Sequence, residues 1–314
     1  MPILKYNDYN PKQSARLLID LANSILEDFD RQGYKLTLRQ LYYQLVAKDV
    51  IENSQKSYDR VGKIISRARD AGMIDWKYIE DRTRVVQSHP HWDDGQDFMR
   101  SAVPQYRHDL WKGQDTRVMV FVEKQALEQV VGRAASKWDV PYFANKGYLS
   151  SSSAWNVARN MMLLNKDKCQ SWVILHLGDH DPSGIDMSRD IKERLENYAR
   201  LSAKDKDRGL EFLEIEVRRI ALNLEQVQEY DPPPNPAKQV DPRFKDYQEK
   251  FGDESWELDA LQPSVINALI NDEIEAIVDE EMFDERETLQ TEIRCQLLED
   301  ADIAHDDEGE PLED

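Results

Sequence analysis

The chain has 314 residues, a formal net charge of −20 and 40% hydrophobic residues. This length suggests about two domains, and the hydrophobic content is enough for a sizeable core. No segment approaches the roughly 20 consecutive apolar residues that cross a bilayer, and the N-terminus lacks the pattern of a secretory signal. The two cysteines, Cys169 and Cys295, have neither disulfide-framework nor zinc-site spacing. We therefore expect a cytoplasmic protein without a membrane partner.

The acidic charge is concentrated at the C-terminus. Residues 280–314 carry 15 acidic and 2 basic side chains, a local charge of −13, which leaves −7 for the other 279 residues. Because electrostatic attraction depends on local patches, the overall acidity does not exclude a nucleic-acid partner, although a basic balance that would favour one is absent. Basic residues do cluster in the N-terminal third of the chain, at Arg60, Lys63, Arg67 and Arg69.

Three amphipathic helices are predicted near the N-terminus. The first covers residues 11–32, where apolar residues recur at helical spacing. Thr37 and Gln40 form a capping-box pattern that begins the second helix, and the third covers 57–71, with the four basic residues on its polar face. Residues 73–86 are expected to form a short β-hairpin. Three helices followed by such a wing describe a winged helix-turn-helix domain, whose third helix faces DNA. The alternative, that the basic face is only a solvated surface, stays open.

Residues 83–114 are polar and are interpreted as an irregular linker. His89 and His91 flank a proline there, but no nearby carboxylate or cysteine completes a familiar ligand spacing, so a metal site is not favoured.

From Arg117 onward, strands and helices alternate. Residues 118–122 are a continuous apolar run, which is typical of a strand buried on both faces. The alternation predicts a mostly parallel sheet with helices on both faces. The predicted strands are 118–122, 140–144, 172–177 and 212–217, and the predicted helices are 126–138, 152–164 and 185–201.

The segment after this α/β region begins with a proline-rich connector at 231–236. A charged helical stretch and two acidic helices, 263–279 and 281–298, are predicted beyond it, and the last residues, from Ala304, are expected to be disordered. The overall prediction is an α/β protein with an N-terminal winged helix-turn-helix domain, a parallel α/β domain and an acidic helical extension. The predicted domains are 1–86, the linker 87–116, 117–230 and 231–314.

Carboxylates follow two of the predicted strands. Glu123 ends the first strand, and Asp179 and Asp181 end the third in an Asp-x-Asp-Pro-x-Gly string. Parallel strands end at one edge of a sheet, so these three carboxylates would repel one another unless a cation such as Mg²⁺ lay between them. Polar residues commonly begin loops, so a structural role is the preferred interpretation of Glu123 taken alone. The Asp-x-Asp-Pro-x-Gly string is a more specific sign of a functional site.

These motifs resemble known ones. The glutamate after a strand, Gly147 after the second strand and the Asp-x-Asp-Pro-x-Gly string are similar to the Toprim domain of topoisomerases, primases and some nucleases. Residues 38–43, Leu-Arg-Gln-Leu-Tyr-Tyr, resemble the Arg-x-x-Tyr-Tyr helix of the topoisomerase VI A subunit and the related meiotic double-strand-break protein. Both motifs occur in that family's order, and the resemblance covers about residues 15–230.

The resemblance implies that Tyr43 is the nucleophile and that Arg39 is a functional residue. The chemistry is consistent, because a phenol with a pKa of about 10 needs activation, and an i, i+4 pair shares one helix face. Tyr42 points about 100° away and is expected to serve packing. Without the Toprim motif, packing would be the preferred role of both tyrosines.

By the same resemblance, Glu123, Asp179 and Asp181 bind Mg²⁺, and Lys124 and Lys146 are candidate phosphate contacts. Tyr43 of one protomer would attack a phosphate held at the metal site of its partner, so a homodimer would leave a 5′-phosphotyrosyl link on each strand of double-stranded DNA. His180 is expected to point away from the metal.

The chain also departs from the family. The segment between Tyr43 and Glu123 is shorter than in full-length A subunits, no ATPase region is present, and the family's topoisomerase needs a separate ATP-binding B subunit. The chain is most similar to the compact stand-alone Mini-A type of viruses and mobile elements, and a nucleoid-associated place in the cytoplasm is expected. Two alternatives stay open: a Toprim nuclease that activates water, and a non-catalytic winged-helix DNA-binding protein.

Overall fold

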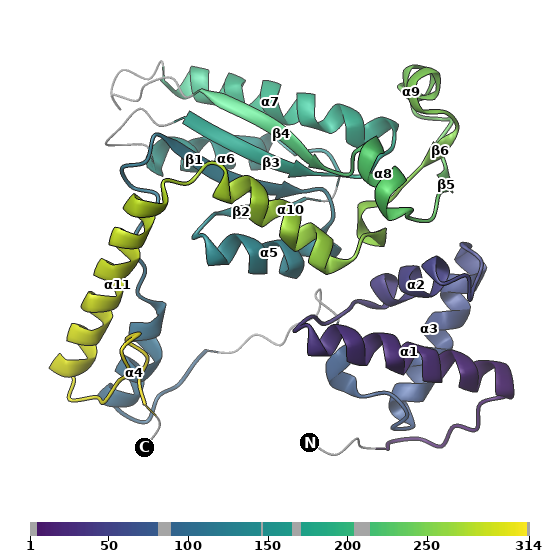
Figure 1. The fold of residues 1–314 in the computed structure, drawn as a ribbon, viewed down its shortest axis with the longest axis horizontal. Coiled ribbons are helices and arrows are strands. Elements are labelled where there is room, and N and C mark those ends of the chain that lie inside the picture. Colours follow the sequence, from purple (N-terminus) through teal and green to yellow (C-terminus); the bar gives the residue numbers. More distant parts are fainter. Residues whose placement is uncertain (1–4, 81–88, 146, 165–170, 204–213, 313–314) are drawn as a thin grey trace.

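The computed structural model describes residues 5–80, 89–145, 147–164, 171–203 and 214–312. In these parts of the chain, N-terminal helices are followed by a parallel α/β layer structure and then by C-terminal helices (Figure 1). No helix among the described residues combines the length and the apolarity that crossing a membrane requires.

The three predicted N-terminal helices are present as α1 (Gln13–Arg31), α2 (Leu38–Ala47) and α3 (Gln55–Asp70). The predicted capping box at α2 is confirmed, since the Thr37 side chain accepts a hydrogen bond from the Gln40 N–H and the Gln40 side chain accepts one from the Thr37 N–H. The helices enclose one apolar core, which includes Leu26, Leu41, Leu45 and Ile65.

The predicted wing is not formed by the described residues that follow α3. A 3-10 helix covers Trp76–Tyr78, and Ile79 makes only an isolated parallel bridge with Leu36. The Asp75 side chain caps this turn by accepting a hydrogen bond from the Lys77 N–H at 3.0 Å, which favours a turn over a strand. The rest of the predicted hairpin, residues 81–86, lies outside the described residues.

The predicted parallel sheet is confirmed. Its strands are β1 (Thr116–Val122), β2 (Tyr142–Ala144), β3 (Ser171–Leu177) and β4 (Ile215–Ala221). They lie in the order β2-β1-β3-β4, and all neighbouring pairs are parallel. The described part of β4 ends at Ala221, whereas the predicted strand 212–217 ends earlier. The strand continues through the charged residues Arg218 and Arg219.

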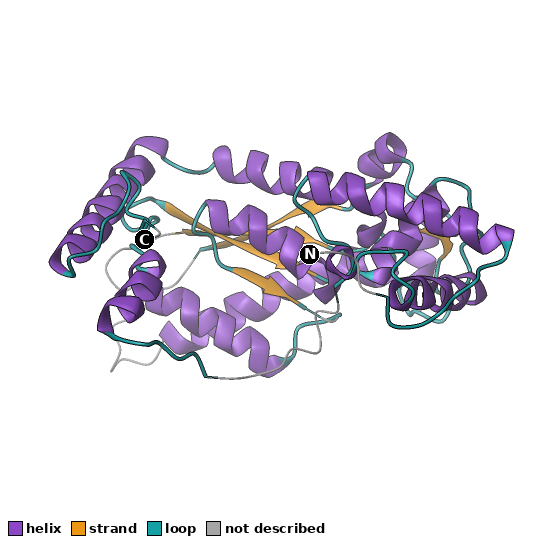
Figure 2. Cartoon of the chain, turned by 90° about the horizontal axis from the view of Figure 1, so that it is seen from below, coloured by secondary structure: helices purple, strands orange, loops and turns teal. Residues whose placement is uncertain are grey.

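Helices cover both faces of the sheet (Figures 1 and 2). On one face, α6 (Ser151–Leu164) and α7 (Pro182–Ala203) pack around a core with Phe121 and Ile174. On the other face, a 3-10 turn at Gln125–Leu127 leads into α5 (Glu128–Lys137), which packs with α10 (Pro263–Glu275) around a second core. That second core contains Val118, Val120, Leu175, Ile266 and Ile270. The C-terminal helix α10 is therefore part of the α/β layer structure.

The segment between β4 and α10 returns to the carboxyl edge of the sheet. It contains α8 (Leu224–Tyr230), α9 (Phe244–Phe251) and the antiparallel pair β5 (Asn235–Pro236) and β6 (Glu254–Ser255). A further 3-10 helix at Leu258–Ala260 leads toward α10.

Two predictions about the linker and the tail are wrong. The linker contains a helix, α4 (Gly95–Ala102), which begins where the Asp94 side chain accepts the Asp97 N–H at 2.8 Å. It lies beside α11 (Glu280–Asp300) in Figure 1. Residues 304–312, expected to be disordered, form a turn closed by a His305–Pro311 bridge and by the Leu312 N–H bonded to the Ala304 oxygen at 2.9 Å. Val103, Leu298 and Ile303 form a small core beneath them.

Candidate active site

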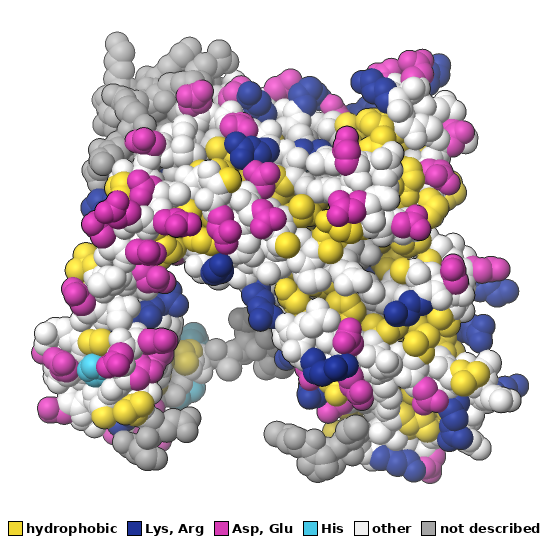
Figure 3. All heavy atoms as spheres, viewed as in Figure 1, with side chains coloured by type: hydrophobic (Ala, Val, Ile, Leu, Met, Phe, Trp, Pro, Cys, Tyr) yellow, Lys and Arg dark blue, Asp and Glu magenta, His cyan; other side chains and the backbone are white. Residues whose placement is uncertain are grey.

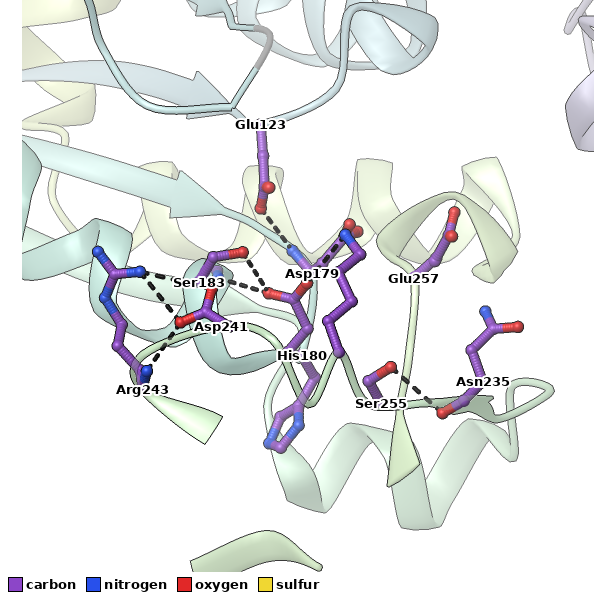
Figure 4. Close-up of polar contacts among 12 residues, drawn as sticks. Glu123, Asp179, His180, Ser183, Asn235, Asp241, Arg243, Ser255 and Glu257 are labelled. Carbon is purple, nitrogen blue, oxygen red and sulfur yellow. Dashed lines mark hydrogen bonds and ion pairs between the residues drawn. The ribbon is translucent and has the colours of Figure 1, made fainter. Parts of the chain in front are cut away.

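The three predicted carboxylates lie after β1 and β3 at one edge of the sheet. Val122 and Leu177 are register partners at the ends of these strands, so the residues that follow emerge side by side. The Glu123 Oε2 atom accepts a hydrogen bond from the Asp179 N–H at 2.9 Å, and Figure 4 shows the Glu123 side chain pointing toward Asp179.

The Asp-x-Asp-Pro-x-Gly string also has a structural role. The Asp181 Oδ1 atom accepts hydrogen bonds from the Gly184 N–H at 2.6 Å and the Ser183 hydroxyl at 2.9 Å, so Asp181 caps the N-terminus of α7. A Cβ atom on Gly184 would lie 2.2 Å from the Asp179 carbonyl oxygen. Only glycine fits there, which explains the last position of the string.

Several carboxylates lie close together at the carboxyl edge of the sheet, and their surroundings change their pKa values. Burial raises the pKa of Glu123, and the charge of Asp181 adds to the increase. Burial also raises the pKa of Asp179 to about 7, despite the opposing charge of Lys124. Half-buried Arg219 on β4 donates to the carbonyl oxygens of Gly178 and Asp179 at 2.9 and 2.7 Å.

The chemistry of these residues fits a hard divalent cation. Carboxylate oxygens are the ligands that Mg²⁺ prefers, and a cation would favour the charged forms of both carboxyl groups against the burial that raises their pKa values. Within the described ranges, however, no three Asp, Glu, His or Cys side chains converge as a ready-made metal site. The Lys124 ammonium group lies at this edge of the sheet, 3.0 Å from the Asp179 Oδ1 atom.

The Arg39–Tyr43 pair lies on α2 as predicted. Arg39 Nη2 donates to the Tyr43 hydroxyl oxygen at 3.4 Å, and its guanidinium carbon lies 5.8 Å from the Tyr43 ring centre. Tyr42 points elsewhere. Its hydroxyl oxygen accepts the Ser54 N–H at 2.8 Å and is 3.1 Å from the Asn53 Oδ1 atom. The two adjacent tyrosines therefore make different polar contacts, and their separate roles stay predictions.

Helix α2 meets the carboxyl edge of the sheet through Glu257. The Tyr43 hydroxyl donates to the Glu257 Oε2 atom at 2.8 Å, and Arg39 donates to the same oxygen at 2.6 Å. Lys124 contacts that oxygen at 2.7 Å and Asp259 at 2.9 Å. A continuous chain of polar contacts thus connects Tyr43 to Asp179.

Tyr43 is protonated in this arrangement. Burial raises its pKa, the charges of Asp259 and Glu257 raise it further, and Arg39 only partly opposes them. A phenol in this state needs a change of environment before it attacks. Beside it lies a cavity of about 310 Å³, which leaves room for an incoming group. The cavity is lined by Arg39, Tyr42, Tyr43, Asn53, Ser54, Gln55, Tyr58, Asn235 and Glu257.

The basic residues of α3 differ in their surroundings. Arg60, Lys63 and Arg67 are exposed, as DNA contact requires. Arg69 instead donates to the carbonyl oxygens of Trp76 and Ile79 at 3.1 and 2.9 Å and lies over the Trp76 ring. On the face drawn in Figure 3, Lys and Arg are denser over the N-terminal helices, and Asp and Glu over α10 and α11.

Two residues considered in the sequence analysis remain, His180 and Lys146. His180 is buried, its Nδ1 atom lies 2.8 Å from the Tyr247 hydroxyl, and Figure 4 shows its ring pointing away from Glu123 and Asp179. It is structural, as predicted. Lys146 lies outside the described residues.

No family model and no curated protein matches this chain.

Sequence reasoning missed Glu257, Asp259 and Arg219. The first two come from a segment, Trp-Glu-Leu-Asp-Ala-Leu, that was placed outside the resemblance and given no role. Its one signal was a pair of acidic residues within an otherwise apolar stretch. Arg219 was missed because the strand was predicted to end before it.

Proposed function

We propose that this chain cleaves DNA with Tyr43 in a metal-dependent transesterification, as a relative of the topoisomerase VI A subunit of the compact Mini-A type. The observation that supports this most is the contact between Tyr43 and Glu257. It places a tyrosine with an arginine partner next to the acidic edge of a parallel sheet, where ligands of such sheets commonly bind.

In the proposed reaction, the Tyr43 hydroxyl oxygen attacks the scissile phosphorus and loses its proton. The bond between the phosphorus and the 3′ oxygen of the neighbouring nucleotide breaks. This 3′ oxygen gains a proton, and a 5′-phosphotyrosyl bond forms. Arg39 and Lys124 bind the phosphate oxygens, with Lys146 as a further candidate, and their charges also favour the phenolate. The exposed basic residues of α3 hold the flanking duplex.

Glu123, Asp179 and Asp181 are the residues that would hold Mg²⁺, which would stabilise the negative charge that develops on the phosphate. The same side chains keep this edge of the sheet strongly negative without the ion, so phosphate binding is expected to depend on it.

A double-strand break needs two such reactions, so we propose a homodimer that acts on double-stranded DNA. A separate ATP-binding B-type subunit is a further proposed partner, because the family's strand passage uses one. The proposed place of action is DNA of the nucleoid in the cytoplasm.

A second function, hydrolysis by activated water at the same carboxylates, is favoured by one observation. Tyr43 is a protonated phenol with a carboxylate partner, which is a poor nucleophile in this state. In that case Tyr43 is only a packing residue and forms no covalent bond to DNA.

One experiment separates these functions. Supercoiled plasmid is incubated with the protein and Mg²⁺, denatured with detergent and extracted with phenol, with and without protease. Linear DNA that enters the phenol phase unless protease is added supports transesterification. Linear DNA that stays in the aqueous phase supports the nuclease. Intact plasmid with undiminished binding supports the non-catalytic winged-helix alternative.

A further inference from the structure

The cavity of about 310 Å³ beside Tyr43 is formed mainly by helix α2 and the start of helix α3. Seven of the nine described residues that line it lie between residues 39 and 58, so one chain supplies most of its wall, whichever chain of a dimer supplies Asn235 and Glu257. Pockets that bind small ligands begin at about this volume. The proposed cleavage uses Arg39 and Tyr43 but leaves the side of the cavity at the start of α3 without a role.

Three tyrosine rings line this cavity. Tyr42 lies edge-on to Tyr43, with ring centres 5.4 Å apart, and edge-on to Tyr58, with ring centres 5.2 Å apart. Tyr42 and Tyr43 are buried, whereas Tyr58 is half-buried and therefore more accessible. Each ring has two faces, so edge-to-face contacts leave at least one face for another flat group. Nucleobases stack on such aromatic faces in proteins that bind unpaired nucleic acid.

Polar groups at the start of α3 are suited to the edge of a base. Gln55 is exposed, and its Nε2 atom donates to the Asp59 Oδ1 atom at 2.8 Å. Within the described ranges, neither the Gln55 Oε1 atom nor the Tyr58 hydroxyl has a hydrogen-bond partner. Carboxamide groups form hydrogen bonds with the polar edges of bases, so this side of the cavity has a free acceptor and a free hydroxyl for a ligand.

The charges of the cavity favour a neutral group over a phosphate. Of the described residues that line it, Arg39 and Glu257 are the charged ones, and Arg39 Nη2 lies 2.6 Å from the Glu257 Oε2 atom. The two charges offset each other, and a phosphate inside the cavity would meet the carboxylate. The Arg39 side chain keeps 49% of its surface exposed, so it can still contact a phosphate outside. A neutral base inside the cavity, with its backbone phosphate outside, matches this arrangement.

We propose that this cavity binds one unpaired nucleobase of the DNA, next to the phosphate that Tyr43 attacks. This inference rests on the proposed function and adds a substrate preference to it, namely DNA with an unpaired base near the cleavage position. A base inside a duplex reaches such a cavity only by leaving the base stack, and this costs least where the base is mismatched or already unpaired. The chain should therefore prefer locally unpaired DNA to a perfect duplex.

The first test compares the affinities of two DNAs. A perfect duplex and the same duplex with a short central bubble of mismatched pairs are titrated at equal salt with the Tyr43→Phe chain and Mg²⁺, so that no phosphotyrosyl adduct forms. The bubble DNA is expected to bind about 10-fold more tightly or better, because its bases are already unpaired. Equal affinities, or a preference for the perfect duplex, would overturn the inference.

Substitutions at Tyr58 connect this preference to the cavity. Tyr58→Leu, added to the Tyr43→Phe chain, should weaken binding of the bubble DNA about 5- to 100-fold, the usual range for the loss of one base–aromatic stack. Binding of the perfect duplex should change little. Tyr58→Phe keeps the ring and should retain most of the preference, and Arg67→Ala, a control outside the cavity, should change both affinities by the same factor. A bubble preference that survives Tyr58→Leu unchanged would show that another surface binds the base.

Photocrosslinking locates the base directly and does not depend on how well a Tyr58 variant folds. 5-Iododeoxyuridine is placed in the bubble, its complex with the Tyr43→Phe chain is irradiated, and the crosslinked residue is identified by mass spectrometry. A crosslink at Tyr58 or Tyr42 is expected. Crosslinks confined to aromatic residues outside the cavity, such as exposed Trp76 and Trp92, or no crosslink at all, would contradict the inference.

These measurements record binding, so they separate the base site from the proposed cleavage. If bubble DNA is preferred through Tyr58 but the wild-type chain forms no phosphotyrosyl adduct, the base site is supported and the proposed cleavage fails. If the wild-type chain forms the adduct but shows no preference for bubble DNA, the proposed cleavage is supported and the base site fails.

Discussion

His180 and Trp256 exchange two main-chain hydrogen bonds, at 2.8 and 3.0 Å, although they lie far apart in the sequence. The His180 ring packs against Tyr247, Phe251 and Trp256 at centre distances of 5.6, 4.8 and 5.6 Å. The residue between the two aspartates is therefore the attachment point of the C-terminal segment. This attachment brings Glu257 and Asp259, which lie beyond residue 230, next to Lys124 at the carboxyl edge of the sheet.

The double role of Asp181 gives the first prediction. Asp181→Ala removes the cap of α7 and should lower stability by about 1 kcal/mol, whereas Asp181→Asn keeps a good capping residue and should leave the melting temperature nearly unchanged. Both changes remove a proposed metal ligand, and both should slow the proposed cleavage on the order of a thousandfold or more. Thermal unfolding and plasmid cleavage are measured for both variants.

Glu123→Ala and Asp179→Ala extend this test without touching the cap. They should lose cleavage to the same degree and keep the fold, and wild-type melting should rise with added Mg²⁺ while that of the variants does not. Normal cleavage in all of these variants would remove the metal site from the proposal.

Local patterns predicted the sheet and its carboxyl edge. The apolar runs of β1 and β3 are buried on both faces, and the residues that follow them had to emerge at one edge. Glu257 could not be placed in this way. Its position depends on the His180–Trp256 pairing and on the fit of the C-terminal segment across the sheet edge, and neither leaves a local pattern.

The errors have similar causes. β4 was predicted to end before Arg218 and Arg219, yet the strand continues through both, and the Arg219 Nη atoms donate to the carbonyl oxygens of Gly178, Asp179 and Gly184. The acidic tail was predicted to be disordered from its composition, but Ile303 packs into a small core with Val103 and Leu298. In both cases tertiary contacts outweighed composition.

The second prediction separates the basic residues of α3. Arg67→Ala should weaken DNA binding and flatten the log–log dependence of affinity on salt by roughly 0.9, the value for one lost phosphate contact. Arg69→Ala should instead lower stability by about 1–2 kcal/mol, because it breaks two hydrogen bonds and the contact with Trp76. Binding titrations at several salt concentrations and thermal unfolding measure the two effects. If the slope is unchanged in Arg60, Lys63 and Arg67 variants alike, α3 does not face DNA.

The third prediction concerns pH in metal-free protein. The pKa of Asp179 is raised from 3.8 to about 7, so the folded chain holds this proton after the unfolded chain has lost it. The contribution of Asp179 to stability is therefore greatest below about pH 4 and is lost as the pH rises toward 7. Asp179→Asn cannot ionise, so its melting temperature relative to wild type should increase across this window. Glu257 has the opposite sign: its pKa is lowered from 4.5 to about 2, so its contribution is present above pH 4.5 and is lost below it.

A melting difference between Asp179→Asn and wild type that stays constant from pH 4 to 7 would contradict the assigned burial of Asp179. Glu123→Gln is a second useful variant, because burial also raises the pKa of Glu123, and it should change the pH dependence in the same direction.

The last prediction distinguishes the adjacent tyrosines. Tyr42→Phe removes a hydroxyl that accepts the Ser54 N–H and bonds the loop before α3, so it should cost about 1–2 kcal/mol of stability and leave adduct formation intact. Tyr43→Phe keeps the ring and loses only the bonds to Arg39 and Glu257. It should bind DNA normally, because Arg39 and Lys124 remain, and should form no adduct. The assay follows labelled DNA for protease-sensitive adduct and compares binding at equal salt. If Tyr42→Phe alone loses the adduct, the nucleophile is the neighbouring residue and the mechanism stands. If both single variants and the double variant still cleave without any adduct, water is the nucleophile and Tyr43 serves only to hold α2 against Glu257.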